Sequence, residues 1–325
     1  MKEVIRTVNL DAGESMFFAR QLEYIKQQSY DILYPEYKAT TQIPVSTEAG
    51  PGAESITYRE FDTVGIMKII SNYADDLPRS DVRGKEYTIP VRSIGGSYGY
   101  NVQEIRAARM ANKPLELRRA EAARRAYEQM VNRIGFFAKS DDGIYGGLTG
   151  LIYNPNITKA DANTGDWLNP TTTADQIIYD FAQAYYNMID LTKGVEIPDV
   201  AMMPPKEFSR IRTLPRSTIS DTTVYTFIMN NHPELKEIVW VNELKQVTPK
   251  PSTPTVGGSV SDIMILYRKD PMKLTFEIPQ PFEQFPVQER GLEYLIPTHA
   301  RVGGVICYYP LSVAVIEKIS STTYH

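Results

Sequence analysis

Two β-rich stretches separated by a polar segment constrain the fold more than any other feature of the chain. Residues 56–71 (ITYREFDTVGIMKIIS) and 86–100 (EYTIPVRSIGGSYGY) alternate in part between apolar and polar residues, which is typical of strands. The segment between them, NYADDLPRSDVRGK, is polar and charged. This order predicts a long β-hairpin. Because no helical segment is placed to cover it, we expect the hairpin either to project from the body or to pack on another chain.

A long amphipathic helix is predicted directly after the hairpin, in residues 112–135 (NKPLELRRAEAARRAYEQMVNRIG). Apolar residues recur there at steps of three and four and form one stripe, and Gly135 is placed to end the helix. Arginines and glutamates occupy the other side, where Arg124 and Glu128 are four residues apart and can pair. The pattern predicts a stiff rod with a core side and a charged side.

The arginine excess of this helix raises the alternative of a nucleic-acid-binding protein. The formal net charge of the whole chain is −4, however, whereas a general nucleic-acid binder is basic. The apolar stripe also shows that one side of the helix packs on protein. We therefore expect the charged side to meet neighbouring subunits or to face an interior. Whether Arg118 and Arg125 contact a carboxylate or nucleic acid stays open.

Residues 34–55 (YPEYKATTQIPVSTEAGPGAES) have several prolines, little periodicity and few residues for a core. A disordered linker is one interpretation of such a segment. An extended arm is favoured because a linker would not need apolar anchors. The candidate anchors are Tyr34, Tyr37, Ile43 and Val45.

The rest of the chain predicts a body of mixed helices and strands. Apolar spacing, prolines and β-rich runs place the individual elements, and no internal repeat is visible. The prediction is a helix at 174–192, a buried strand at 200–203, a short helix at 206–213, a strand at 238–241, a surface loop at 248–261 and strands from 262 onward.

Length and composition fit a globular protein without a membrane anchor. The chain has 325 residues, of which 42% are hydrophobic and 23% charged. No apolar run approaches the length that crosses a bilayer, and the start lacks the apolar core of a secretory signal peptide. Cys307 is the only cysteine, which excludes an intrachain disulfide and a thiolate metal cage. We expect a protein that is made in a reducing cytosol and does not contact membranes.

One short motif raises the possibility of catalysis. Residues 95–99 (GGSYG) match the G-x-S-x-G nucleophile elbow, with Ser97 as the nucleophile and His232 or His299 as a downstream base. The flanking segments are not alternating parallel strands and helices, and no oxyanion segment precedes the motif. The simpler interpretation is that the glycines let a hairpin strand bend. A serine hydrolase using Ser97 is therefore kept only as an alternative.

No other constellation of residues predicts an enzyme, a cofactor or a metal site. The histidines are far apart, and the Gly-rich stretch 143–150 (GIYGGLTG) lacks the pattern of a phosphate-binding loop. Two pairs of neighbouring aspartates lie in polar loops, where solvated charges are the first interpretation and a cation at a subunit contact the second. These pairs are Asp75 with Asp76 and Asp141 with Asp142.

The order of the parts resembles the major capsid protein of tailed bacteriophages, a fold shared with encapsulin shells. The resemblance covers essentially the whole chain and depends on order and spacing, since no single residue is diagnostic. It implies an α+β chain with the Hong-Kong-type (Johnson) capsid fold. The segments that carry it are LELRRAEAARRAYEQMVNRIGFFAKSDDGIYGGLTG for the spine helix, ADQIIYDFAQAYYNM with PDVAMMPPKEFSRIRTL for the axial domain, and FEQFPVQERGLEYLIPTHARVGGVICYYPLSVAVIE for the peripheral and closing axial strands.

The resemblance also implies a division of the chain into parts. Because the chain starts almost at the arm, we expect any scaffold to be a separate protein or to have been removed by cleavage. Some members of the family cross-link a hairpin lysine to an asparagine, but nothing in this sequence assigns that chemistry. The implied parts are an N-terminal arm (1–55), an E-loop hairpin (56–100), a peripheral domain with the spine helix (101–142 and 271–299) and an axial domain (143–270 and 300–325).

The expected function is that of a structural subunit, not an enzyme, in the virion. Copies of the chain would form the hexamers and pentamers of an icosahedral head around double-stranded DNA, with a scaffolding protein, a portal and a cement protein as further partners. An encapsulin-type compartment is the alternative with the same fold. We expect the contacts between subunits to involve Tyr34, Tyr37, Ile43, Val45, Arg59, Lys68, Asp75, Asp76, Arg79, Arg83, Lys85, Arg118 and Arg125.

Overall fold

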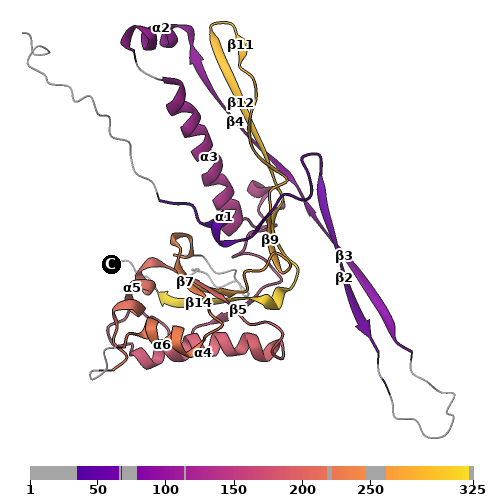
Figure 1. Ribbon diagram of the computed structural model, residues 1–325, viewed down its shortest axis with the longest axis vertical. Helices are drawn as coiled ribbons and strands as arrows, with labels where there is room; N and C mark the ends of the chain where they lie inside the picture. Colours follow the sequence, from indigo (N-terminus) through magenta and orange to yellow (C-terminus); the bar gives the residue numbers. More distant parts are fainter. Residues whose placement is uncertain are drawn as a thin grey trace, which may run out of the picture. The chain divides into compact units, whose positions relative to one another are not determined.

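The computed structural model describes residues 35–65, 67, 79–112, 115–217, 222–245, 247 and 261–321, with only the backbone described at 115–117 and at 321. The chain divides into two units, Met1–Glu36 and Tyr37–His325. All of the described helices and strands belong to the second unit, which is described below by itself (Figure 1).

A two-stranded hairpin forms where the sequence predicts one, although its second strand begins earlier and ends earlier than expected. Strand β2 (Ser55–Val64) pairs with β3 (Asp81–Pro90) along its whole length. The expected second strand, 86–100, is wrong beyond Pro90, because β4 (Arg92–Asn101) belongs to another sheet. Both β3 and β4 alternate in the same way, so the pattern could not show that the chain changes partner at Val91.

Strand β4 instead forms a long ribbon beside the predicted rod. It pairs antiparallel with β12 over all ten residues, and Gly99 lets the two backbones approach, since a Cβ there would lie 3.1 Å from the Tyr294 carbonyl oxygen. Asn101 then starts α2, because its side chain accepts from the Gln103 N–H at 3.0 Å. Helix α3 runs beside this ribbon (Figure 1). The elements are α2 (Val102–Ala111), α3 (Leu115–Phe137), β10 (Gln280–Gln284), β11 (Gln288–Arg290) and β12 (Glu293–Val302).

Helix α3 is the predicted amphipathic rod, but it does not end at Gly135. The helix continues to Phe137, so Gly135 lies inside it. A glycine is needed at this position because a Cβ would come within 2.8 Å of the Ala39 Cβ. The Gly-rich segment after the helix covers its last carbonyls. Gly150 N–H donates to the Ala138 oxygen at 2.8 Å, and Leu151 N–H donates to the Gly135 oxygen at 2.8 Å. This segment therefore caps the C-terminal end of α3.

The body is a five-stranded sheet in the order β5-β14-β8-β6-β7. Its central strands are buried on both faces, and alternate residues of β8 belong to two separate apolar clusters. Helices α4 and α6 lie along one face (Figure 1). The elements are β5 (Thr158–Asp161), α4 (Ala174–Leu191), β6 (Val200–Met203), α5 (Pro205–Thr213), α6 (Val224–Asn231), β7 (Glu237–Trp240), β8 (Ser261–Tyr267) and β14 (Val313–Ser321).

These elements confirm the predicted helix at 174–192 and the strands at 200–203 and 238–241 to within a residue or two. Helix α5 begins at Pro205, a first-turn position that tolerates the missing N–H of proline. The predicted surface loop at 248–261 falls almost wholly outside the described residues. Cys307 is buried, and burial raises the pKa of its thiol to about 12.

A three-stranded sheet joins the N-terminal part of the described chain to the body. Strand β1 pairs in parallel with β9, and the Tyr267 hydroxyl donates to the Gln42 oxygen at 2.7 Å. Residues 39–46 are thus docked on their own chain, whereas the arm was expected to bury its apolar residues on neighbouring copies. The elements are α1 (Ala39–Gln42), β1 (Val45–Ser46), β9 (Leu274–Glu277) and β13 (Gly304–Cys307), with short 3-10 helices at Gly143–Tyr145, Asn242–Leu244 and Pro310–Ser312.

Candidate assembly surface

The two faces of the β2–β3 hairpin differ in chemistry, because side chains alternate along each strand and cross-strand partners share a face. On the first face, Glu60 stands opposite Lys85 and Asp62 opposite Arg83. This face therefore carries opposite charges across the ladder.

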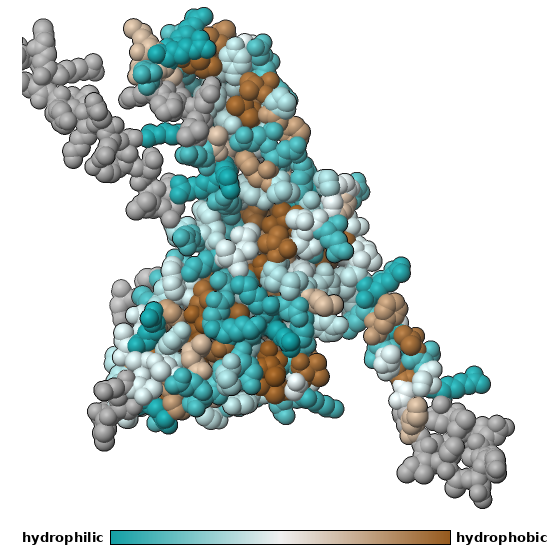
Figure 2. Space-filling view, viewed as in Figure 1, coloured by the Kyte–Doolittle hydropathy of each residue, from teal (hydrophilic) through white to brown (hydrophobic). Residues whose placement is uncertain are grey.

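The second face becomes apolar away from the base of the hairpin. Phe61 stands opposite Gly84, and Thr63 stands opposite Val82. Phe61 is 67% exposed and Val82 is 59% exposed. Gly84 leaves room for the Phe61 ring, since a Cβ there would lie 3.1 Å from the Phe61 Cε1 atom. The Phe61 ring thus lies against Gly84 of its own hairpin, with most of its surface uncovered. Figure 2 shows apolar residues along this part of the hairpin.

The base of the hairpin is held by an aromatic cluster. The Tyr58 ring stacks on Tyr87 with centroids 5.1 Å apart and meets Tyr308 edge to face at 5.0 Å. Burial, together with the neighbouring Tyr87 phenol, raises the pKa of Tyr58 to about 12. Val91 N–H also donates to the Glu54 oxygen at 2.8 Å. These contacts fix the first residues of the hairpin on the body, whereas Arg59 to Val64 and Asp81 to Glu86 are exposed.

Charged side chains on the hairpin are paired locally and stay in contact with solvent. The Arg59 Nε atom lies 2.7 Å from the Glu86 Oε1 atom. Lys85 lies over the Tyr87 ring, with its Nζ atom 4.6 Å from the centroid, and a hydrogen bond to Tyr87 raises the pKa of Lys85. Exposed pairs of this kind contribute little stability to one chain. They remain available to a second surface.

The charged side of α3 pairs partly within the chain. Arg124 and Glu128 form the predicted pair, at 3.1 Å. Arg119 lies 3.0 Å from Glu104 of α2, and its guanidinium lowers the pKa of that carboxyl. Arg118 is exposed and Arg125 half-buried, and each interacts within the chain. Whether either residue also contacts a neighbour or nucleic acid stays a prediction.

Apart from Arg118 and Arg125, the candidate contact residues fall into three groups. Ile43 is wholly buried in the chain's own core, so it is not a surface residue. Tyr37 is half-buried and Val45 exposed, and the exposed hairpin residues are Arg59, Arg79, Arg83 and Lys85. The remaining candidates lie outside the described residues, namely Tyr34, Lys68, Asp75 and Asp76.

The sequence did not single out the apolar positions Phe61 and Val82. Their alternation with charged residues was visible, but the face they share depends on the register of the two strands. A register shifted by one residue would have placed Phe61 opposite a charged side chain.

The serine hydrolase alternative finds no support. Ser97 lies inside strand β4 opposite Pro297, not at the strand-to-helix turn that an elbow requires. The His232 ring is buried, with Nδ1 2.9 Å from the Ile228 oxygen and its centroid 4.5 Å from that of Tyr185. His299 belongs to β12 and packs near Phe285. His299 and Ser97 line the same shallow hollow on the β4–β12 ribbon, but among the described residues no hydrogen bond joins Ser97 to either histidine.

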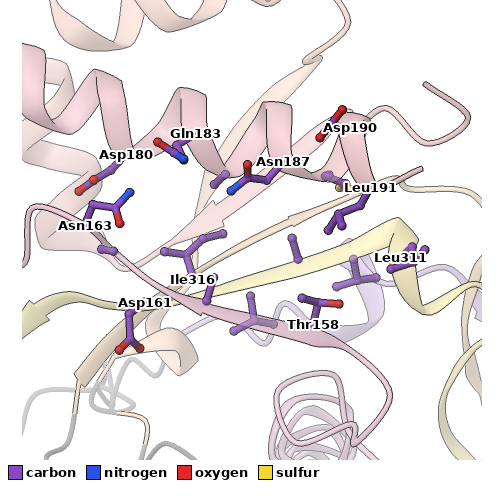
Figure 3. Close-up of a pocket in the computed structure, with 17 residues that line it drawn as sticks. Thr158, Asp161, Asn163, Asp180, Gln183, Asn187, Asp190, Leu191, Leu311 and Ile316 are labelled. Carbon is purple, nitrogen blue, oxygen red and sulfur yellow. The ribbon is translucent and has the colours of Figure 1, made fainter. Parts of the chain in front are cut away.

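A cavity of about 360 Å³ lies between α4 and the strands β5 and β14 (Figure 3). Gln183 and Asn187 point into it from α4, and Leu191 and Leu311 lie at one end. Its described lining contains no histidine, cysteine, serine, lysine or arginine. It therefore lacks the serine and the histidine of the hydrolase alternative.

Neither a metal site nor a membrane-spanning helix is found in the part of the chain that the structure describes. No group of three or more histidine, cysteine or acidic side chains is arranged to hold a metal ion there. None of the described helices combines the length and the apolar character needed to cross a membrane.

Solved structures with this fold include the capsid of a Myoviridae phage and structures from two other phages. The capsid of Myoviridae phage XM1 is 18% identical, with 93% of this chain and 99% of that chain covered and a TM-score of 0.80. A structure from Gordonia phage Cozz is 12% identical over 98% of both chains, with a TM-score of 0.62. One from Mycobacterium phage Ogopogo is 12% identical over 93% of this chain and 99% of that chain, with a TM-score of 0.60. The expected α+β Hong-Kong-type capsid fold is confirmed.

The fold thus places the chain in the class of proteins with the Hong-Kong-type capsid fold. No curated protein matches the chain. A family model described as "Major capsid protein" matches residues 65–319, most of the chain. The chain belongs to the major capsid protein family, and its role is to form the capsid of a phage virion together with copies of itself.

Proposed function

We propose that this chain builds the icosahedral head of a tailed phage or prophage by seating the apolar face of its β2–β3 hairpin on a neighbouring copy. Hexamers and pentamers of the chain would enclose double-stranded DNA. The observation that carries this proposal is the exposure of Phe61 and Val82 on one face of a hairpin fixed only at its base.

The physical argument begins with the hairpin itself. An isolated two-stranded hairpin is marginally stable in water, and a single aromatic residue left exposed does not stabilise it. Covering the Phe61 side chain would contribute about 1.5–3 kcal/mol per copy. The contact is made once by every copy in a closed shell, so a modest contribution is repeated throughout the assembly.

Charge supports the second part of the proposal, loose contact with DNA. The chain has a net charge of −4. A strongly basic lining would hold DNA through salt-dependent phosphate contacts and resist its release. A scaffolding protein, a portal and a cement or decoration protein are the further partners that we propose, with synthesis in the host cytoplasm.

The proposed parts of the chain follow the capsid domains with one change of boundary. We assign the N-terminal arm to 1–55 and the E-loop to the β2–β3 hairpin. The peripheral domain takes α2, α3 and the ribbon of β4, β10, β11 and β12, because β4 pairs there. The axial domain takes the five-stranded sheet and its helices. The encapsulin-type compartment stays an alternative use of the same fold, distinguished by neighbouring portal, protease or terminase genes.

The test is the substitution Phe61→Asp, compared with Met272→Asp as a matched control. Met272 is 79% exposed and lies in a turn outside the hairpin. We expect Phe61→Asp to fold, as judged by circular dichroism, but to sediment as small species and show no shells in negative-stain micrographs. Met272→Asp is expected to assemble like the parent chain. Normal shells from Phe61→Asp would show that this face does not carry the contact.

A further inference from the structure

The five-stranded sheet of the body carries surfaces of opposite charge at its two edges. Its edge strands are β5 and β7. The cavity described above lies at the β5 edge, where that strand, β14 and α4 line it. Helix α5 contacts β7 at the other edge. Every copy of the chain therefore presents both surfaces, at opposite edges of one sheet.

The surface at the β7 edge is basic and is formed by α5 and the residues that follow it. Residues 205–217 (PKEFSRIRTLPRS) contain four basic side chains and a single acidic one, Glu207, which is buried. Three of the basic side chains are exposed, and we call this group the cationic ridge: Lys206, Arg212 and Arg216.

Aromatic rings hold two of the ridge guanidinium groups in place. The Arg212 Cζ atom lies 5.5 Å from the centroid of the Phe208 ring and 5.7 Å from that of Tyr225. The Arg216 Cζ atom lies 3.9 Å from the centroid of the Phe227 ring. A stacked guanidinium still presents N–H groups along its edge, in the fork geometry that matches a carboxylate. The ridge is therefore ordered by its own chain in a form that suits an acidic partner.

The cavity at the β5 edge, which we call the acidic pocket, has the complementary chemistry. Its described lining contains three aspartates and neither lysine nor arginine. Asp161 pairs with Lys318 at 2.5 Å, and Asp180 accepts from the Trp167 Nε1–H at 2.9 Å. Asp190 is exposed in the last turn of α4, so it is placed to accept from a partner.

The surroundings of Asp190 favour arginine as that partner. Leu191 is 60% exposed and Leu311 is 44% exposed, and both lie with Asp190 at one end of the pocket (Figure 3). Lys193, three residues after Asp190, is also exposed, so the charge attraction alone is reduced. Arginine adds to it because its guanidinium is weakly hydrated and its aliphatic stem packs on apolar side chains.

We propose that the cationic ridge of one copy seats in the acidic pocket of the next, with Arg212 and Arg216 directed at Asp190. The inference rests on the proposed self-assembly and adds a second contact to that of the hairpin. Pairing ridge with ridge, or pocket with pocket, would bring like charges together, which is unfavourable. The contact is therefore head to tail, and a head-to-tail contact generates a ring when its rotation closes.

The experiment reverses the charge of each surface in the full chain. The ridge variant carries Arg212→Glu and Arg216→Glu. The pocket variant carries Asp190→Arg and Asn187→Arg, since Asn187 also lines the pocket and is exposed. Circular dichroism checks folding, and sedimentation with negative-stain microscopy measures assembly. Glu289→Arg, at an exposed position on β11, is the control and should assemble like the parent chain.

We expect each reversal variant to place at least about tenfold less protein in the assembled fraction than the parent, because facing like charges cost several kcal/mol. A chain that carries all four substitutions has a negative ridge and a positive pocket. It is therefore expected to assemble again. Neither a misfolded surface nor a ridge that binds DNA would be rescued in this way.

Each other result overturns the contact. Normal assembly of a reversal variant would remove it and leave the proposed function in place, and so would a combined chain that does not recover. A ridge variant that fails while the pocket variant assembles would indicate a different partner for the ridge, such as DNA. If one variant does not fold, the other decides. A parent chain that never assembles would overturn the proposed function together with this inference.

Discussion

Asn132 offers the sharpest test of how the spine helix is tied to the rest of the chain. Its buried side chain accepts from the Ala39 N–H at 2.9 Å through Oδ1, and its Nδ2 donates to the Glu243 Oε1 atom at 2.5 Å. One amide thus joins α3 to the start of α1 and to the 3-10 helix at Asn242–Leu244. We expect Asn132→Ala to weaken both junctions.

The magnitude follows from what each partner loses. Ala39 is wholly buried, so its N–H is left without an acceptor, at a cost of about 1–3 kcal/mol. The Glu243 carboxylate loses the hydrogen bond that the Asn132 amide donates to it. Because Glu243 is only half-buried, water can replace that donor, so this loss adds about 1 kcal/mol to the cost. The expected loss of unfolding free energy is therefore about 2–4 kcal/mol. A second variant, Asn132→Asp, keeps an acceptor for Ala39 but places a carboxylate against Glu243.

Equilibrium urea denaturation of the unassembled chain measures both variants. We expect the Asn132→Asp loss to shrink at pH values low enough to protonate either carboxyl, whereas the Asn132→Ala loss stays the same. Asn187→Ala is the control, since Asn187 is exposed on α4, and it should change stability by less than about 0.5 kcal/mol. A loss below about 1 kcal/mol for Asn132→Ala would refute the argument that this amide satisfies a buried donor.

Two further predictions concern the ends of the helical rod. Gly150→Ala should lower the unfolding free energy, measured by urea denaturation, by about 1–3 kcal/mol. The reason is that a Cβ at this position would lie 2.7 Å from both the Ala138 nitrogen and the Ile134 oxygen. Gly143→Ala is the control and should leave the unfolding free energy unchanged, since there is open space around Gly143. Glu104→Gln should destabilise the chain in thermal melts at pH 7 but not near pH 3. The reason is that Arg119 lowers the pKa of this carboxyl, so its contribution is present above the unfolded value of 4.5 and is lost as pH falls through the lower folded value.

Local patterns predicted most elements of the fold but not the partners of the strands. The apolar stripe of α3 can be recognised from residues that are close together in the sequence. The same is true of strand β6, which ends before Pro204. The break between β3 and β4 cannot be recognised in this way, because both strands show the same alternation of apolar and polar residues. Only the burial of Val91 in the folded chain marks the break. Gly135 shows the same limit. A glycine near the end of a helical pattern indicates the end of the helix, but Gly135 lies inside α3 and leaves room for the Ala39 side chain.

The candidate assembly surface was predicted only in part, because it too depends on contacts between residues that are far apart in the sequence. The hairpin and its charged residues could be recognised from composition, whereas the apolar face of Phe61 and Val82 depends on register. Ile43 was expected at a contact between copies because an arm has no core of its own. The parallel pairing of β1 with β9 supplies that core from residues more than two hundred positions away, which no local pattern contains.

The two halves of the hairpin have different sources of stability, which links folding of this element to assembly. At the base, Tyr58 packs on Tyr87 and Tyr308, so the first residues are ordered by their own chain. Further out, Phe61 has only Gly84 beneath it, and the charged pairs are solvated. The ladder alone offsets little of the entropy lost in fixing those residues. A second copy that covers Phe61 would therefore stabilise both the contact and the hairpin, and part of the contact energy would go into ordering the strands.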